Sequence, residues 1–261
     1  MKPALVTTLL ALAATAGCTS SSAPSGDNSQ RPSPVTFAAI GDSATVAAKL
    51  DQFRIALGGS LNPPTMPATN SGRREINWDG VPAALTNVDT FPGTFFNVNS
   101  PRGAVLIPQV PGLRVDSTAF ASLNPGLAGQ FKFFSAKKMF APVGSKFLTV
   151  KFQLAGTQTP GLVSGFGVVF SDVDAAGSTR VEFLDANGSI LASLTAPGRL
   201  GSHEFSFIGA VFDSSVVAKV QITCGQTVLS SAAVDVSDLD QGADFVAMDD
   251  FVYGEPQPIP Q

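Results

Sequence analysis

The chain has 261 residues, of which 44% are hydrophobic, and its formal net charge at pH 7 is -4. Basic residues gather only at Arg73-Arg74 and Lys137-Lys138, so the sequence offers no counter-surface for a phosphate backbone, and nucleic-acid binding is not expected. The hydrophobic content is enough for the core of one domain of roughly 220 residues.

The first residues have the pattern of an export signal. In "MKPALVTTLLALAATAGC" a basic start at Lys2 is followed by a short apolar run and by small residues before Cys18. The run is too short to span a bilayer, so residues 1–17 are predicted to be a signal peptide. The ending "TAGC" resembles the bacterial lipoprotein box, although Thr15 replaces the usual Leu, Val or Ile. Acylation of Cys18 would anchor the protein to the cell envelope through lipid, and an ordinary signal peptide with secretion is the alternative.

Composition divides the rest of the chain into three parts. Residues 18–34 are rich in serine and proline and nearly lack large apolar side chains, so we expect a disordered tether there. A folded domain is expected over residues 35–255, followed by a disordered proline-rich tail over residues 256–261. The domain has one cysteine, Cys224, which is expected to be a buried strand residue rather than a reactive thiol.

Residues 44–59 have the spacing of a helix. Apolar residues recur every three or four positions, and the segment ends in a double glycine, which is a common helix stop. We therefore expect one short N-terminal helix in a chain whose other periodicity is mainly that of strands. The apolar residues at helical spacing are Val46, Leu50, Phe53 and Leu57.

The stretch "SGRREINWDGVP", residues 71–82, gathers two arginines, two carboxylates and the only tryptophan of a chain in which 14% of residues are charged. In one interpretation the Trp78 ring is a platform for a sugar, and polar side chains around it bind the hydroxyl groups. In the other interpretation Trp78 plugs one end of the fold while the arginines pair with acids. The polar candidates for ligand binding are Arg73, Glu75, Asn77 and Asp79.

Glu75 and Asp79 also permit a catalytic interpretation. Glycoside hydrolysis uses one carboxylic acid to protonate the leaving oxygen and one carboxylate to attack or to activate water. Other chemistries have less support, because His203 is the only histidine and the chain has no G-x-S-x-G or H-E-x-x-H motif. No catalytic residue is assigned, and a hydrolase that uses Glu75 and Asp79 is kept as an alternative.

Strand periodicity is clearest in "KFLTVKFQL", where Leu148, Val150, Phe152 and Leu154 alternate with a mixed set of residues. Further strands are expected at "SGFGVVFSD", "HEFSFIGAVF", "VVAKVQIT" and "DFVAMDDFVYG". In "TRVEFLDANGSILASL" the dipeptide Asn187-Gly188 lies between two apolar runs and predicts a hairpin with a type I′ turn. Many short strands separated by turn residues favour an all-β fold, an antiparallel β-sandwich with one short N-terminal helix.

Aspartates follow apolar stripes in two of these strands. In "GFGVVFSDVD" alternation places Asp172 and Asp174 on the same face as the preceding phenylalanines. In "VAMDDF" one of Asp249 and Asp250 points inward whichever face is buried. A buried carboxylate needs a partner, and calcium held between the ends of the two strands would satisfy these oxygens. The alternative is that each aspartate caps backbone amides or pairs with an arginine such as Arg180.

Five motifs, "GRREINWDGVP", "FFNVNSPRGAV", "GFGVVFSDVD", "VEFLDANGSIL" and "VAMDDFVYGEP", together resemble a family of uncharacterised secreted bacterial proteins over most of residues 57–256. That resemblance implies no established reaction, substrate or catalytic residue. The C-terminal half is also similar to the jelly-roll sandwiches of carbohydrate-binding and surface modules, whose last strand often reads apolar-Asp-Asp-apolar. This likeness implies a jelly-roll-like sandwich.

Together these patterns predict a non-enzymatic extracytoplasmic lipoprotein that binds something at the cell surface, with carbohydrate as the leading ligand class and another envelope component as the alternative partner. The membrane would be reached through the lipid anchor only. A secreted glycan-active hydrolase and a purely structural or adhesive envelope protein are the other two hypotheses. The calcium ion, if bound, would be structural.

Overall fold

The structure is a computed structural model that describes residues 1, 33–199, 204–232 and 244–260. The predicted signal peptide beyond Met1, the lipidation site Cys18, most of the tether and His203 lie outside the described residues. Residues 32–261 cluster into one compact unit. Within the described ranges no helix is long and apolar enough to cross a membrane.

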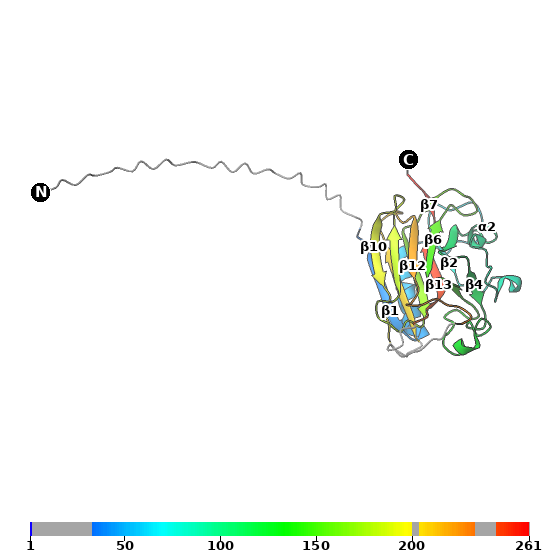
Figure 1. The fold of residues 1–261 in the computed structure, drawn as a ribbon. Coiled ribbons are helices and arrows are strands. Elements are labelled where there is room, and N and C mark those ends of the chain that lie inside the picture. The colour runs from blue at the N-terminus through cyan, green and yellow to red at the C-terminus, as the bar shows by residue number, and fades with distance from the viewer. Residues whose placement is uncertain (2–32, 200–203, 233–243, 261) are drawn as a thin grey trace. The chain divides into compact units, whose positions relative to one another are not determined.

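Two antiparallel sheets form the sandwich, which confirms the all-β, jelly-roll-like prediction (Figure 1). The seven-stranded sheet has the order β1 (Val35–Gly41), β11 (Phe205–Val211), β8 (Gly165–Ser171), β13 (Ala247–Gly254), β5 (Met139–Pro142) and β4 (Leu113–Asp116), and β2 (Arg73–Ile76) also pairs with β13. The five-stranded sheet has the order β10 (Ile190–Thr195), β9 (Arg180–Leu184), β12 (Lys219–Thr223), β6 (Phe147–Phe152) and β3 (Ala104–Pro108). A small third sheet pairs β14 (Gln257–Pro258) with β7 (Gly161–Leu162).

The main core lies between the two sheets and is filled by alternate residues of their strands. Leu148, Val150 and Phe152 of β6 are buried there, as the alternation in the sequence predicts. Many of the ring contacts in this core join phenylalanines, which pack without a polar tip to satisfy. Cys224 follows β12 and is buried against Met248, and burial raises the pKa of its thiol to about 12, as expected for an unreactive cysteine.

Helix α1 (Ser43–Leu57) forms where helical spacing predicts it and covers the outer face of the seven-stranded sheet. Its first turn is capped by Asp42, whose side chain accepts a hydrogen bond from the backbone nitrogen of Thr45 (2.8 Å). The ring of Phe53 lies over Gly167 and Gly209, which face each other on β8 and β11. A Cβ atom at Gly209 would come within 2.8 Å of this ring, so the two glycines make the space that α1 fills.

Three further helical turns connect the strands: α2 (Phe95–Val98) and the 3-10 turns η1 (Ala83–Leu85) and η2 (Pro125–Leu127). The sequence pattern predicted none of them. They are too short to show a helical period, and α2 forms because Phe95 and Phe96 are drawn into the main core.

The structure corrects the predicted hairpin turn between β9 and β10. The hairpin is present, but only Gly188 has a positive φ (84°), whereas a type I′ turn requires positive φ at Asn187 as well. Instead, the Asp185 carboxylate accepts hydrogen bonds from the backbone nitrogens of Asn187 (2.9 Å) and Ser189 (2.8 Å). Asp185 therefore sets a longer turn than the dipeptide alone indicates.

The C-terminal residues also differ from the prediction, because part of the expected disordered tail 256–261 is a strand. Gln257 and Pro258 form β14 and pair with β7. The side-chain amide of Gln257 donates a hydrogen bond to the backbone oxygen of Thr69 (2.9 Å). These contacts hold a proline-rich segment whose composition alone indicates disorder.

Candidate functional site

The Trp78 side chain belongs to the core. Only 1% of it is exposed, and its ring stacks on Phe140 with centroids 4.2 Å apart and an interplanar angle of 6°. Its Nε1 donates a hydrogen bond to the backbone oxygen of Asp249 (2.7 Å). The backbone of Trp78 has φ of 63°, in the left-handed region that bulky residues rarely adopt, and Val81 N donates to its oxygen in the turn that follows. Because both ring faces are covered, the Trp78 ring cannot stack on a sugar. Its surroundings match the interpretation in which Trp78 plugs one end of the fold.

The charged residues of the same stretch are paired within the protein. Glu75 accepts hydrogen bonds from Arg54 of α1 (2.8 and 3.0 Å) and from Arg73 (2.8 Å). Burial alone would raise the pKa of Glu75, but the hydrogen bonds and charges of the two arginines outweigh it and hold this pKa below its ordinary value. Glu75 thus ties β2 to α1 as an ionised carboxylate.

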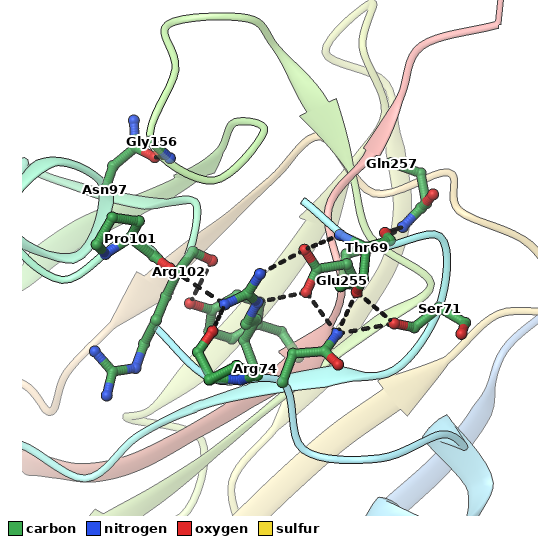
Figure 2. Close-up of polar contacts among 12 residues, drawn as sticks. Thr69, Ser71, Arg74, Asn97, Pro101, Arg102, Gly156, Glu255 and Gln257 are labelled. Atoms are coloured by element: carbon green, nitrogen blue, oxygen red, sulfur yellow. Dashed lines mark hydrogen bonds and ion pairs between the residues drawn. The ribbon is translucent and has the colours of Figure 1, made fainter. Parts of the chain in front are cut away.

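Arg74 is turned to the other side and is fully buried with Glu255 (Figure 2). Its Nη2 donates to Glu255 Oε1 (2.8 Å), and the backbone nitrogen of Thr69 donates to the same oxygen (3.2 Å). Figure 2 shows the Arg102 side chain pointing away from this pair. The ion pair joins β2 to the end of β13 and leaves neither charge open to a ligand.

The remaining predicted ligand-binding residues do not converge with Trp78 on an open pocket. Asp79 accepts a hydrogen bond from the backbone nitrogen of Lys137 (2.9 Å), and the backbone oxygen of Asn77 accepts one from Ser135 Oγ (2.9 Å). The cavity beside Asn77 and Trp78 has a volume of about 70 Å³. This is small for a sugar, since ligand pockets typically measure roughly 300–1,000 Å³.

The four aspartates considered for calcium have different neighbours. Asp172 has φ of 67° and ends the alternation of β8, and its carboxylate accepts a hydrogen bond from Gln130, while Asp174 N donates to the carboxylate of Asp244 (3.2 Å). Across the described ranges, no three or more His, Cys, Asp or Glu side chains gather as a metal ion would require. The four residues therefore do not form one cluster, and a structural calcium ion stays a prediction.

Asp249 and Asp250 are both buried, whereas simple alternation predicts one inward and one outward side chain. The register between β13 and β8 shifts between Met248 and Phe251, and this bulge brings both carboxylates to the interior. Asp249 accepts hydrogen bonds from Phe134 N (2.8 Å) and Ser135 Oγ (2.7 Å). Burial raises the pKa of both carboxyl groups, and the charge of Asp250 raises that of Asp249 further.

A different surface has the features of a binding site: the outer face of the five-stranded sheet, here called the bare face. In Figure 1 the labelled strands β10, β12 and β6 belong to one layer, with β9 between β10 and β12, and no helix lies in front of them. Outward residues of adjacent strands form rows across the sheet, and the middle row contains Ile107, Thr149, Gln221, Glu182 and Ser193. Burial alternates along β6 and β12, which confirms that these residues point away from the core.

Two hollows open on the bare face, with volumes of about 390 and 480 Å³. Both are bordered by Ile107 and Thr149, so they adjoin along the sheet. The first also contains Phe147, which is 40% exposed, together with Arg180 and Gln221. An exposed aromatic ring beside planar amide and guanidinium groups provides both a stacking surface and directed hydrogen bonds.

The bare face could not be found from the sequence pattern alone, although one signal is present. In "KFLTVKFQL" the outward positions include Phe147, a large apolar residue where a solvated strand usually has a polar one. The other residues of the face lie on strands that are distant in the sequence, so only the pairing of β3, β6, β12 and β9 brings them together.

Comparison with solved structures finds low-level similarity to several proteins, among them the following three. One is the carbohydrate-binding module TmCBM61 in complex with β-1,4-galactotriose, at 10% identity over 63% of this chain and 90% of that chain, with a TM-score of 0.29. Another is the CBM22-1 xylan-binding domain from Paenibacillus barcinonensis, at 11% identity over 63% and 90% of the two chains, with a TM-score of 0.27. The third is the enzymatically active domain of tailspike protein 4 of bacteriophage CBA120, at 12% identity over 66% of this chain and 22% of that chain, with a TM-score of 0.30. At these TM-scores the likenesses carry no argument about this chain.

No protein-family model matches the chain, and no curated protein matches it. The resemblance to secreted bacterial proteins therefore rests on the sequence motifs alone.

Proposed function

We propose that this protein is an extracytoplasmic, lipid-anchored binding module that holds a carbohydrate on the bare face without cleaving it. The observation that carries the proposal is the pair of adjoining hollows on a solvated sheet, where exposed Phe147 and Ile107 lie beside Gln221, Arg180 and Glu182. Sugar rings have apolar faces and a rim of hydroxyl groups. This mixture of apolar and planar polar side chains is complementary to both.

The shape of the bare face favours an extended chain over a single small molecule. The two hollows follow one another across several strands rather than forming one deep cavity. The side chains that border them stand on paired strands, whose backbone positions are fixed by hydrogen bonds within the sheet. A ligand would therefore meet a preformed surface, which lowers the entropy that binding costs.

Two observations support binding without catalysis. Glu75, the residue considered as a glycosidase acid, is held ionised by Arg54 and Arg73, whereas a general acid needs a raised pKa. Asp249 and Asp250 have raised pKa values, but both are buried on the covered side of β13, where Phe134 and Ser135 donate to Asp249, and neither lines the bare face.

The lipid anchor in this proposal rests on "TAGC" and on the serine- and proline-rich segment after it. The test is metabolic labelling with a fatty acid followed by detergent-phase partitioning. Wild-type protein should carry the label and enter the detergent phase, and Cys18→Ser should do neither. A wild-type protein that never carries the label would be secreted instead of anchored.

The binding function is tested with a glycan array probed with the Cys18→Ser chain, scored for retention and for cleavage products. Retention of one glycan class without cleavage is the expected result. Cleavage would make the protein a hydrolase. Absence of retention across the array would favour a structural or adhesive envelope protein.

A further inference from the structure

Two lysines of the bare face stand directly opposite each other. Lys151 of β6 and Lys219 of β12 are register partners, and both point outward because their neighbours Val150 and Val220 are buried in the core. Residues opposite each other on antiparallel strands have Cβ atoms about 4.5–5.5 Å apart, and like charges in that position destabilise the pair. The sheet therefore holds two positive charges close together at one level.

The lysine pair is not neutralised by the protein. Within the described part of the chain, neither ammonium group takes part in an ion pair or hydrogen bond, and the partners of these lysines on the flanking strands are Val105 and Leu184. The acid that lines the same hollow, Asp185, accepts hydrogen bonds from backbone nitrogens of its own turn. This arrangement occurs in a chain whose net charge is -4, so acidic residues are not scarce.

Elsewhere on the bare face, a positive side chain is paired with a negative one. Arg180 and Glu182 lie two residues apart on β9 and form an ion pair (3.7 Å). Their charges cancel at the end of the bare face that contains Phe147, whereas the 480 Å³ hollow, lined by Lys151, Lys219 and Asp185, keeps an excess of one positive charge. The bare face thus has a neutral half and a positive half.

We propose that Lys151 and Lys219 form a subsite for the carboxylate of an acidic sugar, so that the preferred ligand is a uronic-acid-containing glycan. This inference rests on the proposed function and specifies its ligand class. A carboxylate between the two ammonium groups would form two charge-assisted hydrogen bonds and remove the repulsion between the lysines. The apolar residues of the same hollow, among them Ile107 and Ala218, then contact the body of the sugar ring.

The test compares two probes that share a backbone and differ in charge: polygalacturonate and its fully methyl-esterified form. Affinity electrophoresis of the Cys18→Ser chain at low salt should show about tenfold tighter binding to polygalacturonate, as expected for two exposed charge pairs. The preference should shrink as salt is added, because exposed charges are screened. The double variant Lys151→Gln, Lys219→Gln should bind both probes equally.

The control variant is Lys137→Gln, which removes an exposed lysine outside the bare face and should keep the preference. The melting temperature of the double variant should equal or exceed that of the wild type, because the substitutions relieve a repulsion. A lower melting temperature would mean that the lysines stabilise the sheet, which contradicts the inference. Equal binding of the two probes by the wild type would overturn it too.

Two further probes identify the source of the charge. Equal or tighter binding to dextran sulfate would overturn the assignment to a carboxylate, and equal binding to vesicles of anionic phospholipid would replace the glycan by a membrane surface. If the methyl-esterified polymer binds and Phe147→Ala abolishes that binding, the proposed function holds whatever the lysines do. If neither polymer binds and the glycan array is also blank, the proposed function itself fails.

Discussion

The two outer faces of the sandwich differ in how they meet solvent. On the seven-stranded sheet, Gly167 and Gly209 leave a space that the Phe53 ring of α1 fills. On the five-stranded sheet, the outward residues are longer, and Phe147 and Lys151 stand in solvent with no helix over them. The small residues on one face make a site for the protein's own helix, and the large ones on the other face leave surface for something else.

Charge separates the two faces as well. On the covered side, Arg54 and Glu75 pair with each other, and buried Asp249 accepts hydrogen bonds from Phe134 and Ser135. On the bare face, Lys151 and Lys219 oppose each other, and the hollow they line contains one acid, Asp185, against the two positive charges. Unfavourable local choices that the rest of the fold tolerates often mark functional surfaces, because stability and binding select for different residues.

The largest effect is expected on the covered face. Phe53→Ala removes the ring that fills the space over Gly167 and Gly209, and it should lower the free energy of unfolding by about 3–5 kcal/mol. Chemical denaturation followed by tryptophan fluorescence measures this change. Glycan binding by the folded fraction should be unaffected, and a loss below about 1 kcal/mol would mean that α1 does not seal this face.

Trp78→Phe tests whether Trp78 contributes to stability or to ligand binding. The substitution keeps an aromatic ring but removes the Nε1 donor to the Asp249 oxygen, which should cost about 1–3 kcal/mol of stability. Because the ring is buried, the affinity for glycan should stay at the wild-type value. Weaker binding by a fully folded Trp78→Phe protein would return Trp78 to the ligand site.

The buried aspartates make the covered side sensitive to pH. The pKa values of Asp249 and Asp250 are raised well above the ordinary value, mainly by burial and, for Asp249, also by the charge of Asp250. A carboxyl group with a higher pKa in the folded chain holds its proton more tightly there, so its contribution to stability is full below about pH 4 and is lost as the pH rises through the folded-state pKa. Between about pH 5 and about pH 8 the wild type should lose stability steadily, and Asp249→Asn should lose less.

Thermal unfolding in a series of buffers measures this dependence. Asp213→Asn is the matched control, because it removes one negative charge from an exposed side chain and should keep the wild-type slope. If Asp249→Asn also kept that slope, the aspartate pair would not be the group that titrates.

The smallest change in stability is expected on the bare face. Phe147→Ala removes a side chain that is 40% exposed, and the free energy of unfolding should change by no more than about 0.5 kcal/mol. Differential scanning calorimetry on the two proteins measures the shift. A loss comparable with that of Phe53→Ala would show that Phe147 is part of the core rather than of a binding surface.

The sequence predicts the regular parts of this fold well. Helical spacing and the terminal glycines locate α1, and the alternation of Leu148, Val150 and Phe152 locates β6 with the correct buried face. In these segments the local sequence pattern and the tertiary packing favour the same structure, so the pattern predicts which residues are buried. The antiparallel sandwich follows from the number and spacing of such strands.

The candidate site could not be predicted in the same way, because it depends on interactions between distant segments. Trp78 looks like an exposed platform among charged neighbours until Phe140 and Asp249 are seen to enclose it. The bulge in β13 likewise buries two consecutive aspartates, which alternation does not permit. The opposition of Lys151 and Lys219 is a matter of strand register that neither segment specifies alone.

The most direct test of the account compares two exposed apolar side chains, one on each outer face. Phe147 is 40% exposed on the bare face, and Ile55 is 80% exposed on α1. Isothermal titration calorimetry measures the affinity of Phe147→Ala and of Ile55→Ala for the glycan that the array retains best. Both variants are used at the same folded fraction. We expect Phe147→Ala to weaken binding by up to about tenfold, because one stacking ring is lost, while Ile55→Ala binds like the wild type. Equal affinities for the two variants, or a loss only with Ile55→Ala, would contradict the assignment of the bare face as the binding surface.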